Sequence, residues 1–211
     1  MSETKIKICG LSRIQDIEYV NESLPDFIGF VFTKSRRQVE PEAAEKLKAA
    51  LDRGVKAVGV FVNEDMSLIK SLCKDGIIDY IQLHGDEDNE YIAELKTQLE
   101  KAGCLKPIIK AVRVKDAEAL NTAVEFDTDF LLLDTFTGKE YGGTGKTFDW
   151  KLAKSISRPF FLAGGLRCDN VLQAVKTAGP FCVDISSGVE TNGFKDGAKI
   201  KDIVKLIRSV K

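Results

Sequence analysis

Short runs of hydrophobic residues recur along the whole chain, and each run is followed by polar residues or glycine. The runs are rich in Ile, Val, Leu and Phe and mostly lack strict alternation with polar positions. Runs of this kind are typical of strands that are buried on both faces, as in a parallel sheet covered by helices. The predicted strands are residues 5–9, 27–32, 56–62, 79–83, 107–113, 129–134, 159–163 and 181–185.

The stretches between these runs have the spacing of amphipathic helices. Residues 41–51 begin with a proline followed by early glutamates, and Gly54 comes just after them. Proline is favoured in the first turn of a helix and glycine just beyond its end. Residues 169–178 begin with Asp169 as a candidate N-cap and end before Gly179. The alternation therefore predicts a repeating strand–helix unit.

Eight such units predict an α/β fold class, a single (β/α)8 barrel. A doubly wound parallel sheet is the structural alternative, but it usually contains fewer alternations than this chain of 211 residues shows. We therefore expect one barrel domain over residues 1–211, with no internal boundary. In such barrels the active site lies at the carboxyl ends of the strands, so residues that directly follow the runs are candidates for chemistry.

Composition excludes several classes of function. The 31 basic and 32 acidic residues are spread evenly and give a net charge of −1, so no basic patch predicts binding to nucleic acid. No apolar run approaches the roughly 20 residues that a membrane span needs. Five scattered cysteines form no paired spacing, which favours reduced thiols in a cytoplasmic protein over a disulfide framework or a structural zinc site.

Two residues suited to acid–base chemistry end the first and sixth predicted strands. Cys9 and Asp134 would meet at one mouth of a closed barrel, where a thiol and a carboxyl can act on one substrate as base and acid. A lone cysteine is more often a buried core residue, so the position of Cys9 is what favours catalysis. Alternation places Lys7 on the same side as Cys9, and we expect its ammonium to favour the thiolate.

Glycine and serine follow the seventh and eighth predicted strands, which is where barrels of this class commonly bind phosphate. Gly164 and Gly165 follow one run, and Ser187 and Gly188 follow the next. Glycine lets the backbone approach a ligand closely, and serine hydroxyls donate to phosphate oxygens. Each turn alone is more simply a tight turn, but the two together predict a phosphate site.

Further polar residues follow the second, fourth and sixth runs. Arg36 and Arg37 are suited to binding an anion, although a solvated basic loop is the simpler interpretation. His84 is the only histidine, which excludes zinc sites that need two or three. It is equally well explained as a substrate contact or as a residue that anchors a loop. Gly143 and Gly145 belong to a long loop of the kind that often forms a lid.

Nine segments, taken in order, resemble the phosphoribosylanthranilate isomerases, enzymes of tryptophan biosynthesis with a TIM-barrel fold. Any one segment would be weak, whereas the ordered set covers nearly the whole chain. The segments are KICGL (7–11), GFVF with SRR behind it (29–37), VGVFVN (58–63), QLHGDE (82–87), LLLD (131–134), GGTGKTFDW (142–150), LAGGL (162–166), VDISSGVE (183–190) and KDGAKI (195–200).

The resemblance implies an Amadori rearrangement of N-(5-phosphoribosyl)anthranilate to 1-(2-carboxyphenylamino)-1-deoxyribulose 5-phosphate. It implies that Asp134 is the general acid and Cys9 the general base, that Arg37 binds the anthranilate carboxylate, and that Asp184 lies near the ribose hydroxyls. No metal or cofactor is implied. The remaining residues expected to bind substrate are Gln82, His84, Gly143, Gly145, Gly164, Gly165, Ser187 and Gly188.

The expected partner is this small-molecule substrate alone, with no nucleic acid and no membrane, for a cytoplasmic monomer or homodimer. Three alternatives to this function stay open. One is an isomerase of dual specificity that also acts on a phosphoribosyl substrate of histidine biosynthesis, although such enzymes usually pair two aspartates. Another is a phosphosugar-binding barrel without catalysis. The last is an aldolase that forms a Schiff base through Lys110.

Overall fold

Eight parallel strands form a closed barrel in the computed structural model, which describes residues 3–135 and 149–209. The strands are β1 (Lys5–Cys9), β2 (Phe27–Val31), β3 (Lys56–Phe61), β4 (Tyr80–Leu83), β5 (Ile108–Val114), β6 (Phe130–Thr135), β7 (Phe160–Leu162) and β8 (Cys182–Ile185). Every strand end lies within one residue of its predicted position. The (β/α)8 barrel is confirmed, and the doubly wound alternative is wrong because β8 pairs with β1.

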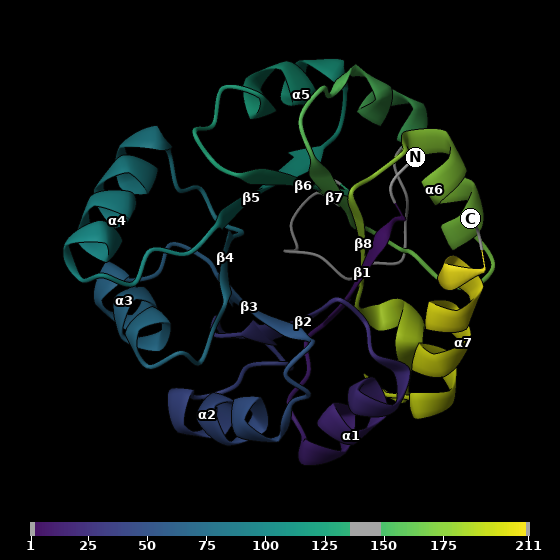
Figure 1. Ribbon diagram of the computed structural model, residues 1–211. Coiled ribbons are helices and arrows are strands. Elements are labelled where there is room, and N and C mark those ends of the chain that lie inside the picture. Colours follow the sequence, from purple (N-terminus) through teal and green to yellow (C-terminus); the bar gives the residue numbers. More distant parts are fainter. Residues whose placement is uncertain (1–2, 136–148, 210–211) are drawn as a thin grey trace.

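A ring of helices surrounds the barrel (Figure 1). The helices are α1 (Ile14–Ser23), α2 (Pro41–Ala50), α3 (Met66–Lys74), α4 (Asn89–Lys101), α5 (Ala117–Ala123), α6 (Val171–Ala178) and α7 (Gly197–Arg208), with the 3₁₀ helices η1 (Trp150–Ser155) and η2 (Ser187–Val189). Between β6 and β7 the described chain forms η1 in place of an α-helix.

Local signals explain where most helices begin. Aspartate side chains accept a hydrogen bond from the first turn of α3, α4, α5 and α7, which satisfies backbone N–H groups that have no partner within the helix. Pro41 opens α2 as expected. The predicted cap at Asp169 is wrong, because the N-cap of α6 is Asn170. The Asn170 side chain instead accepts a hydrogen bond from the backbone N–H of Arg167.

Two separate hydrophobic cores hold the barrel together. The larger core lies between the strands and the surrounding helices. The smaller core fills the barrel interior and contains Phe27, Val58, Ile109, Leu132 and Phe161. Because successive side chains of a strand point to opposite faces, β2 contributes Ile28 to the larger core and Phe27 to the smaller one.

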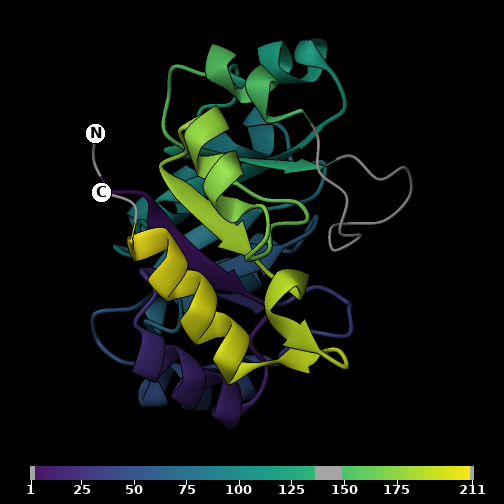
Figure 2. The same ribbon diagram turned by 90° about the vertical axis from the view of Figure 1, so that its right-hand side faces the viewer.

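A short antiparallel hairpin follows β8 and was not expected from the hydrophobic runs. Its strands are β9 (Glu190–Thr191) and β10 (Phe194–Lys195), joined through Asn192 and Gly193. Figure 2 shows the hairpin next to η2, beyond the carboxyl end of β8. It therefore extends the face of the barrel on which the strands end.

No helix in the described ranges has both the length and the apolar character to cross a bilayer.

Candidate active site

A cavity of about 320 Å³ lies at the carboxyl ends of the barrel strands. Side chains from β1, β4, β6 and β8 and from the loops after β2, β7 and β8 line it. The predicted site residues that line it are Cys9, Arg37, Gln82, His84, Asp134, Gly164, Gly165, Asp184, Ser187 and Gly188. The predicted residues Gly143 and Gly145 lie outside the described part of the chain.

The thiol of Cys9 lies at the end of β1, beside β2. Its register partner is Gly29, and a Cβ atom at that position would lie 2.6 Å from the Cys9 sulfur. Gly29 therefore provides the space that the thiol occupies. Burial raises the pKa of Cys9, while the Lys7 ammonium lowers it, and the net shift is upward. The expected influence of Lys7 has the predicted direction, but burial outweighs it.

Lys7 is fully buried inside the barrel mouth, between β8 and β4. Its ammonium lies 2.7 Å from Oδ2 of Asp184 and donates a hydrogen bond of 2.8 Å to Oε1 of Gln82. Burial lowers the pKa of Lys7, but the carboxylate of Asp184, together with smaller effects of Cys9 and Cys182, more than offsets this, so the pKa lies above its ordinary value. Lys7 therefore remains an ammonium and holds two cavity-lining side chains in place.

Gln82 connects this ammonium to the carboxyl group at the end of β6. Its Nε2 atom lies 2.8 Å from Nδ1 of His84, and Nε2 of His84 lies 3.5 Å from Oδ2 of Asp134. The other oxygen of Asp134 accepts a hydrogen bond of 2.7 Å from the backbone N–H of Thr135. We call the series Asp184–Lys7–Gln82–His84–Asp134 the polar chain; it spans the mouth of the barrel.

The loops after β7 and β8 line the cavity with Gly164, Gly165, Ser187 and Gly188. Gly164 has a φ of +89°, and a Cβ atom there would collide with Thr135, so glycine is required at this position. No hydrogen bond within the described residues uses the backbone N–H of Gly164 or Gly165. These donors, together with the hydroxyl of Ser187, are therefore available to an anionic ligand.

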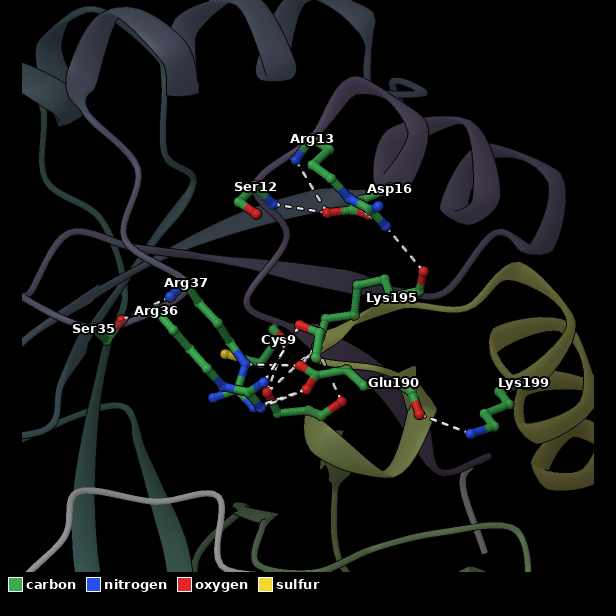
Figure 3. A network of polar contacts seen from close by, with 12 residues as sticks. Cys9, Ser12, Arg13, Asp16, Ser35, Arg36, Arg37, Glu190, Lys195 and Lys199 are labelled. Carbon is green, nitrogen blue, oxygen red and sulfur yellow. Dashed lines mark hydrogen bonds and ion pairs between the residues drawn. The ribbon is translucent and has the colours of Figure 1, made fainter.

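The two arginines after β2 differ in position, although both contact Glu190 (Figure 3). Arg37 lines the cavity, and its Nε and Nη2 atoms donate to Glu190 at 2.7 and 3.2 Å. The side chain of Arg36 is 53% exposed and also donates to the carbonyl of Gly193. Of the two, Arg37 is thus the one placed to meet a ligand.

Glu190 also pairs with Lys195, at 2.8 Å. Burial raises the pKa of Glu190, but hydrogen bonds from Arg37 and Lys195 outweigh this effect and lower the pKa to about 2. The Lys195 ammonium also donates to the carbonyl of Ser186, whose hydroxyl donates to the carbonyl of Cys9. The hairpin thereby joins the arginines to the end of β1 (Figure 3).

The sequence-based prediction did not include Gly29, Glu190 or Lys195, which all contact residues of this site. Asn-Gly favours the two-residue turn of a hairpin because both positions readily take a positive φ, and Asn192 and Gly193 have φ values of 52° and 83°. Recognising it would have brought Glu190 and Lys195 to the barrel mouth. No local signal distinguishes Gly29 from other strand glycines, because its importance comes from the neighbouring strand.

Lys110, considered above as a Schiff-base residue, has a different environment. Its ammonium lies 2.7 Å from Glu87 and donates to the carbonyl of Gly85, and it is not among the described residues that line the cavity. This geometry favours a structural role. Within residues 3–135 and 149–209, no group of three or more His, Cys, Asp or Glu side chains is arranged to hold a metal ion.

Sequence comparison identifies close relatives over almost the whole chain. The model of the family described as N-(5'-phosphoribosyl)anthranilate (PRA) isomerase matches residues 6–206. The N-(5'-phosphoribosyl)anthranilate isomerase of Endomicrobium trichonymphae is 50% identical over 206 residues, covering 98% of this chain and 99% of that protein. The protein of the same name from Acetivibrio thermocellus is 47% identical over 209 residues, covering 97% and 96%.

Solved structures agree with this assignment. Phosphoribosyl anthranilate isomerase from Thermotoga maritima superposes with a TM-score of 0.87 at 36% identity, covering 98% of this chain and all of that one. A phosphoribosyl anthranilate isomerase in complex with reduced 1-(o-carboxyphenylamino)-1-deoxyribulose 5-phosphate gives 0.83 at 33% identity, with the same coverage. The family model, the sequence relatives and the barrel together establish that this chain belongs to the phosphoribosylanthranilate isomerase family.

Proposed function

We propose that this chain is a phosphoribosylanthranilate isomerase of tryptophan biosynthesis. It converts N-(5-phosphoribosyl)anthranilate to 1-(2-carboxyphenylamino)-1-deoxyribulose 5-phosphate by an Amadori rearrangement, and its family membership supports this activity. The observation that carries the assignment of the site is that Cys9 and Asp134 line one cavity with Arg37 and the loops after β7 and β8. This cavity therefore combines loops suited to a phosphate, an arginine suited to a carboxylate, and a thiol and a carboxyl group suited to acid–base chemistry.

The substrate phosphate binds to the loops after β7 and β8. The available N–H groups of Gly164 and Gly165, and the position of Gly188 in the cavity wall, support this placement, since backbone donors and glycine turns suit phosphate oxygens. Ser187 supplies a hydroxyl, whereas the hydroxyl of Ser186 is occupied by the carbonyl of Cys9. Gly143 and Gly145 remain proposed contacts from the loop after β6.

The anthranilate carboxylate binds to Arg37. A guanidinium has five N–H donors, and Glu190 accepts from only the Nε and Nη2 atoms. The remaining edge of the guanidinium is able to meet a second carboxylate, while Glu190 fixes its orientation. Position in the cavity therefore favours Arg37 over Arg36 for this role.

Asp134 acts first, as the general acid. It donates a proton to the ribose ring oxygen, the bond from that oxygen to C1 breaks, and the anthranilate nitrogen forms a protonated Schiff base with C1. The hydrogen bond from Thr135 to Asp134 stabilises the carboxylate that remains. The protonated Schiff base then draws electrons from C2, so the proposal includes no metal or cofactor.

Cys9 acts next, as the general base. Its thiolate removes the proton from C2, the C–H electrons form a C1–C2 double bond, and the iminium becomes an enolamine. The enolamine then tautomerises to the ketone, with a proton added at C1. Because burial raises the pKa of Cys9, the thiolate is a stronger base once it forms.

Asp184 binds the ribose hydroxyls. Its Oδ2 atom is held by Lys7, while its Oδ1 atom is buried and has no hydrogen-bond partner among the described residues. A buried carboxylate oxygen without a donor is costly, so a ligand hydroxyl at this position would be favoured. Gln82 and His84 line the same wall and are proposed to contact the substrate there.

The activity is tested by following loss of anthranilate fluorescence when purified protein is mixed with substrate. Asp134→Asn should lower kcat by about 10²–10⁴-fold with KM nearly unchanged, because the shape is kept and the proton is lost. Asp149→Asn, an exposed helix cap, is the matched control. Wild-type protein without turnover would overturn the function, and an active Asp134→Asn variant would overturn the role of Asp134.

Separate measurements decide among the alternatives. Activity on the histidine-pathway phosphoribosyl substrate as well would establish dual specificity, and binding without turnover would establish a non-catalytic barrel. Borohydride trapping of protein with substrate would reveal a Schiff base at Lys110.

We further propose a cytoplasmic enzyme formed by residues 1–211 as one domain, a monomer or homodimer. One solved structure contains monomers of the dimeric phosphoribosylanthranilate isomerase from Thermotoga maritima.

A further inference from the structure

The proposed mechanism does not explain why Lys7 and Gln82 lie where they do. Both are almost completely buried in the barrel mouth, with exposures of 0% and 1%. Burying an ammonium and an amide is unfavourable unless their hydrogen bonds are satisfied. Together with Asp184, His84 and Asp134 they form the polar chain, in which each contact restricts the next.

The direction of the hydrogen bonds follows from the chemistry of Lys7. An ammonium has donors and no acceptor, so the Gln82 atom that faces Lys7 must be the carbonyl oxygen, Oε1. The amide nitrogen of Gln82 therefore faces Nδ1 of His84 and donates to it. A nitrogen that accepts a hydrogen bond carries no proton, so the proton of neutral His84 is on Nε2.

We propose that Lys7 and Gln82 are positioning residues that fix His84 as the neutral Nε2–H tautomer, which presents a donor to Asp134. Nε2 of His84 lies 3.5 Å from Oδ2 of Asp134, which is long for a hydrogen bond. Such contacts often shorten when substrate binds. A donor at this place stabilises the carboxylate that Asp134 becomes after it releases its proton, so the inference rests on the proposed role of Asp134.

The polar chain orients groups and does not relay a proton. The amide of Gln82 would have to pass through an unstable imidic acid to carry a proton between Lys7 and His84. The same ammonium also influences the thiol of Cys9. The buried Lys7 ammonium thus acts directly on Cys9, the proposed base, and through Gln82 and His84 on Asp134, the proposed acid.

Nuclear magnetic resonance tests the tautomer directly, because His84 is the only histidine in the chain. Long-range ¹H–¹⁵N correlation on untagged, ¹⁵N-labelled protein should show one protonated ring nitrogen, Nε2, and one unprotonated, Nδ1. A proton on Nδ1, or fast averaging of the two tautomers, would overturn the proposal. This measurement needs no substrate and no variant, so it remains informative if the proposed function is wrong.

Two substitutions of Gln82 test what holds the tautomer. Gln82→Met removes the amide, and His84 should then show averaged tautomers. Gln82→Glu places an acceptor opposite Nδ1, and His84 should then carry protons on both nitrogens. Gln173→Glu, on the exposed face of α6, is the matched control and should leave the His84 signals unchanged. A fixed Nε2–H tautomer in Gln82→Met would show that Lys7 and Gln82 do not determine it.

Kinetics test whether the tautomer serves Asp134. In Gln82→Met and Gln82→Glu we expect kcat to fall about 10–100-fold, because a wrongly protonated His84 impairs a proton transfer, and KM to rise by a smaller factor, because the proposed contact of Gln82 with substrate is also lost. An unchanged kcat with averaged tautomers would overturn the link to Asp134. Wild-type protein without turnover would instead overturn the proposed function, so the two failures are distinguishable.

Discussion

The two ends of the barrel interior are built from the same strands but differ in what they contain. At the amino end, Phe27, Phe130 and Phe161 pack edge to face, with ring centroids 5.5 and 5.6 Å apart in the two pairs. At the carboxyl end the interior holds the polar chain, in which Lys7 lies 2.7 Å from Asp184. The first end is stabilised by apolar burial and the second by paired hydrogen bonds and charges.

The change occurs over two residues of a strand. On β8, buried Cys182 belongs to the apolar end and Asp184 to the polar end. On β6 the same step separates Leu132 from Asp134. Side chains two residues apart on a strand point to the same face, so two neighbouring inward-facing residues can lie one in the apolar core and the other in the active-site cavity. Position along the strand, more than residue type, therefore decides the role of an inward-facing residue.

The two inward-facing cysteines give the largest expected contrast. Cys9→Ala should lower kcat by about 10²–10⁴-fold, because the general base is lost, while the melting temperature stays nearly unchanged. Cys182→Ala at the apolar end should leave kcat within about twofold and lower stability by roughly 1 kcal/mol through a small cavity. Fluorescence assays and thermal melts on both variants check this. Equal kcat values for the two variants would remove the functional distinction between the ends.

Removing one member of the buried Lys7–Asp184 ion pair should change the free energy of unfolding differently from removing both. Lys7→Met leaves Asp184 buried without its cation and should reduce the free energy of unfolding by about 3–5 kcal/mol. Adding Asp184→Leu should recover much of that loss without restoring turnover, because an apolar pair replaces the ion pair. Phe161→Ala should cost a similar 3–5 kcal/mol at the apolar end, with no second substitution that compensates so simply.

Urea unfolding of these variants measures the difference. A Lys7→Met variant as stable as the wild type would show that the buried pair contributes nothing to folding, contrary to the polar chain as described.

Of the two ends of the barrel interior, the polar end should be the one that makes the free energy of unfolding depend on pH in acid. The pKa of Glu190 is lowered from 4.5 to about 2, so its contribution is present above pH 4.5 and is lost as pH falls towards 2. The wild type should lose roughly 2–3 kcal/mol more than Glu190→Gln over that range. Urea unfolding of both proteins at pH 5 and pH 3 checks the sign. Parallel losses would mean that Glu190 is not held as a carboxylate by Arg37 and Lys195.

The smallest expected effect on turnover comes from filling the space that Gly29 leaves beside the Cys9 thiol. Gly29→Ala should displace the Cys9 sulfur and reduce kcat about 10-fold, because small misplacements of a reacting group are costly. The melting temperature should fall only slightly, since the side chain of Cys9 is able to rotate. Gly54→Ala, in an exposed turn between α2 and β3, is the control. Wild-type turnover in Gly29→Ala would show that the thiol tolerates the added methyl group.

Much of the fold was predictable because its signals are local. Each strand is a short apolar run, and each such run maps onto one strand to within a residue. The positions of Cys9, Asp134 and the glycine loops followed from the rule that strand ends meet at one face. The hairpin was missed because only residues after apolar runs were considered, whereas Asn192-Gly193 marks a turn between strands of two residues.

The sequence by itself determined the barrel and the residues at its mouth, since the period of hydrophobic residues is encoded locally. Only the tertiary structure decided which of them touch. Lys7 and Asp184 are 177 positions apart and meet because β8 closes the barrel against β1. The space left by Gly29 depends on the pairing of β1 with β2, whereas the contacts of Glu190 and the proposed tautomer of His84 depend on contacts across the barrel mouth. Contacts between distant residues depend on the register of neighbouring strands, and no local pattern specifies that register.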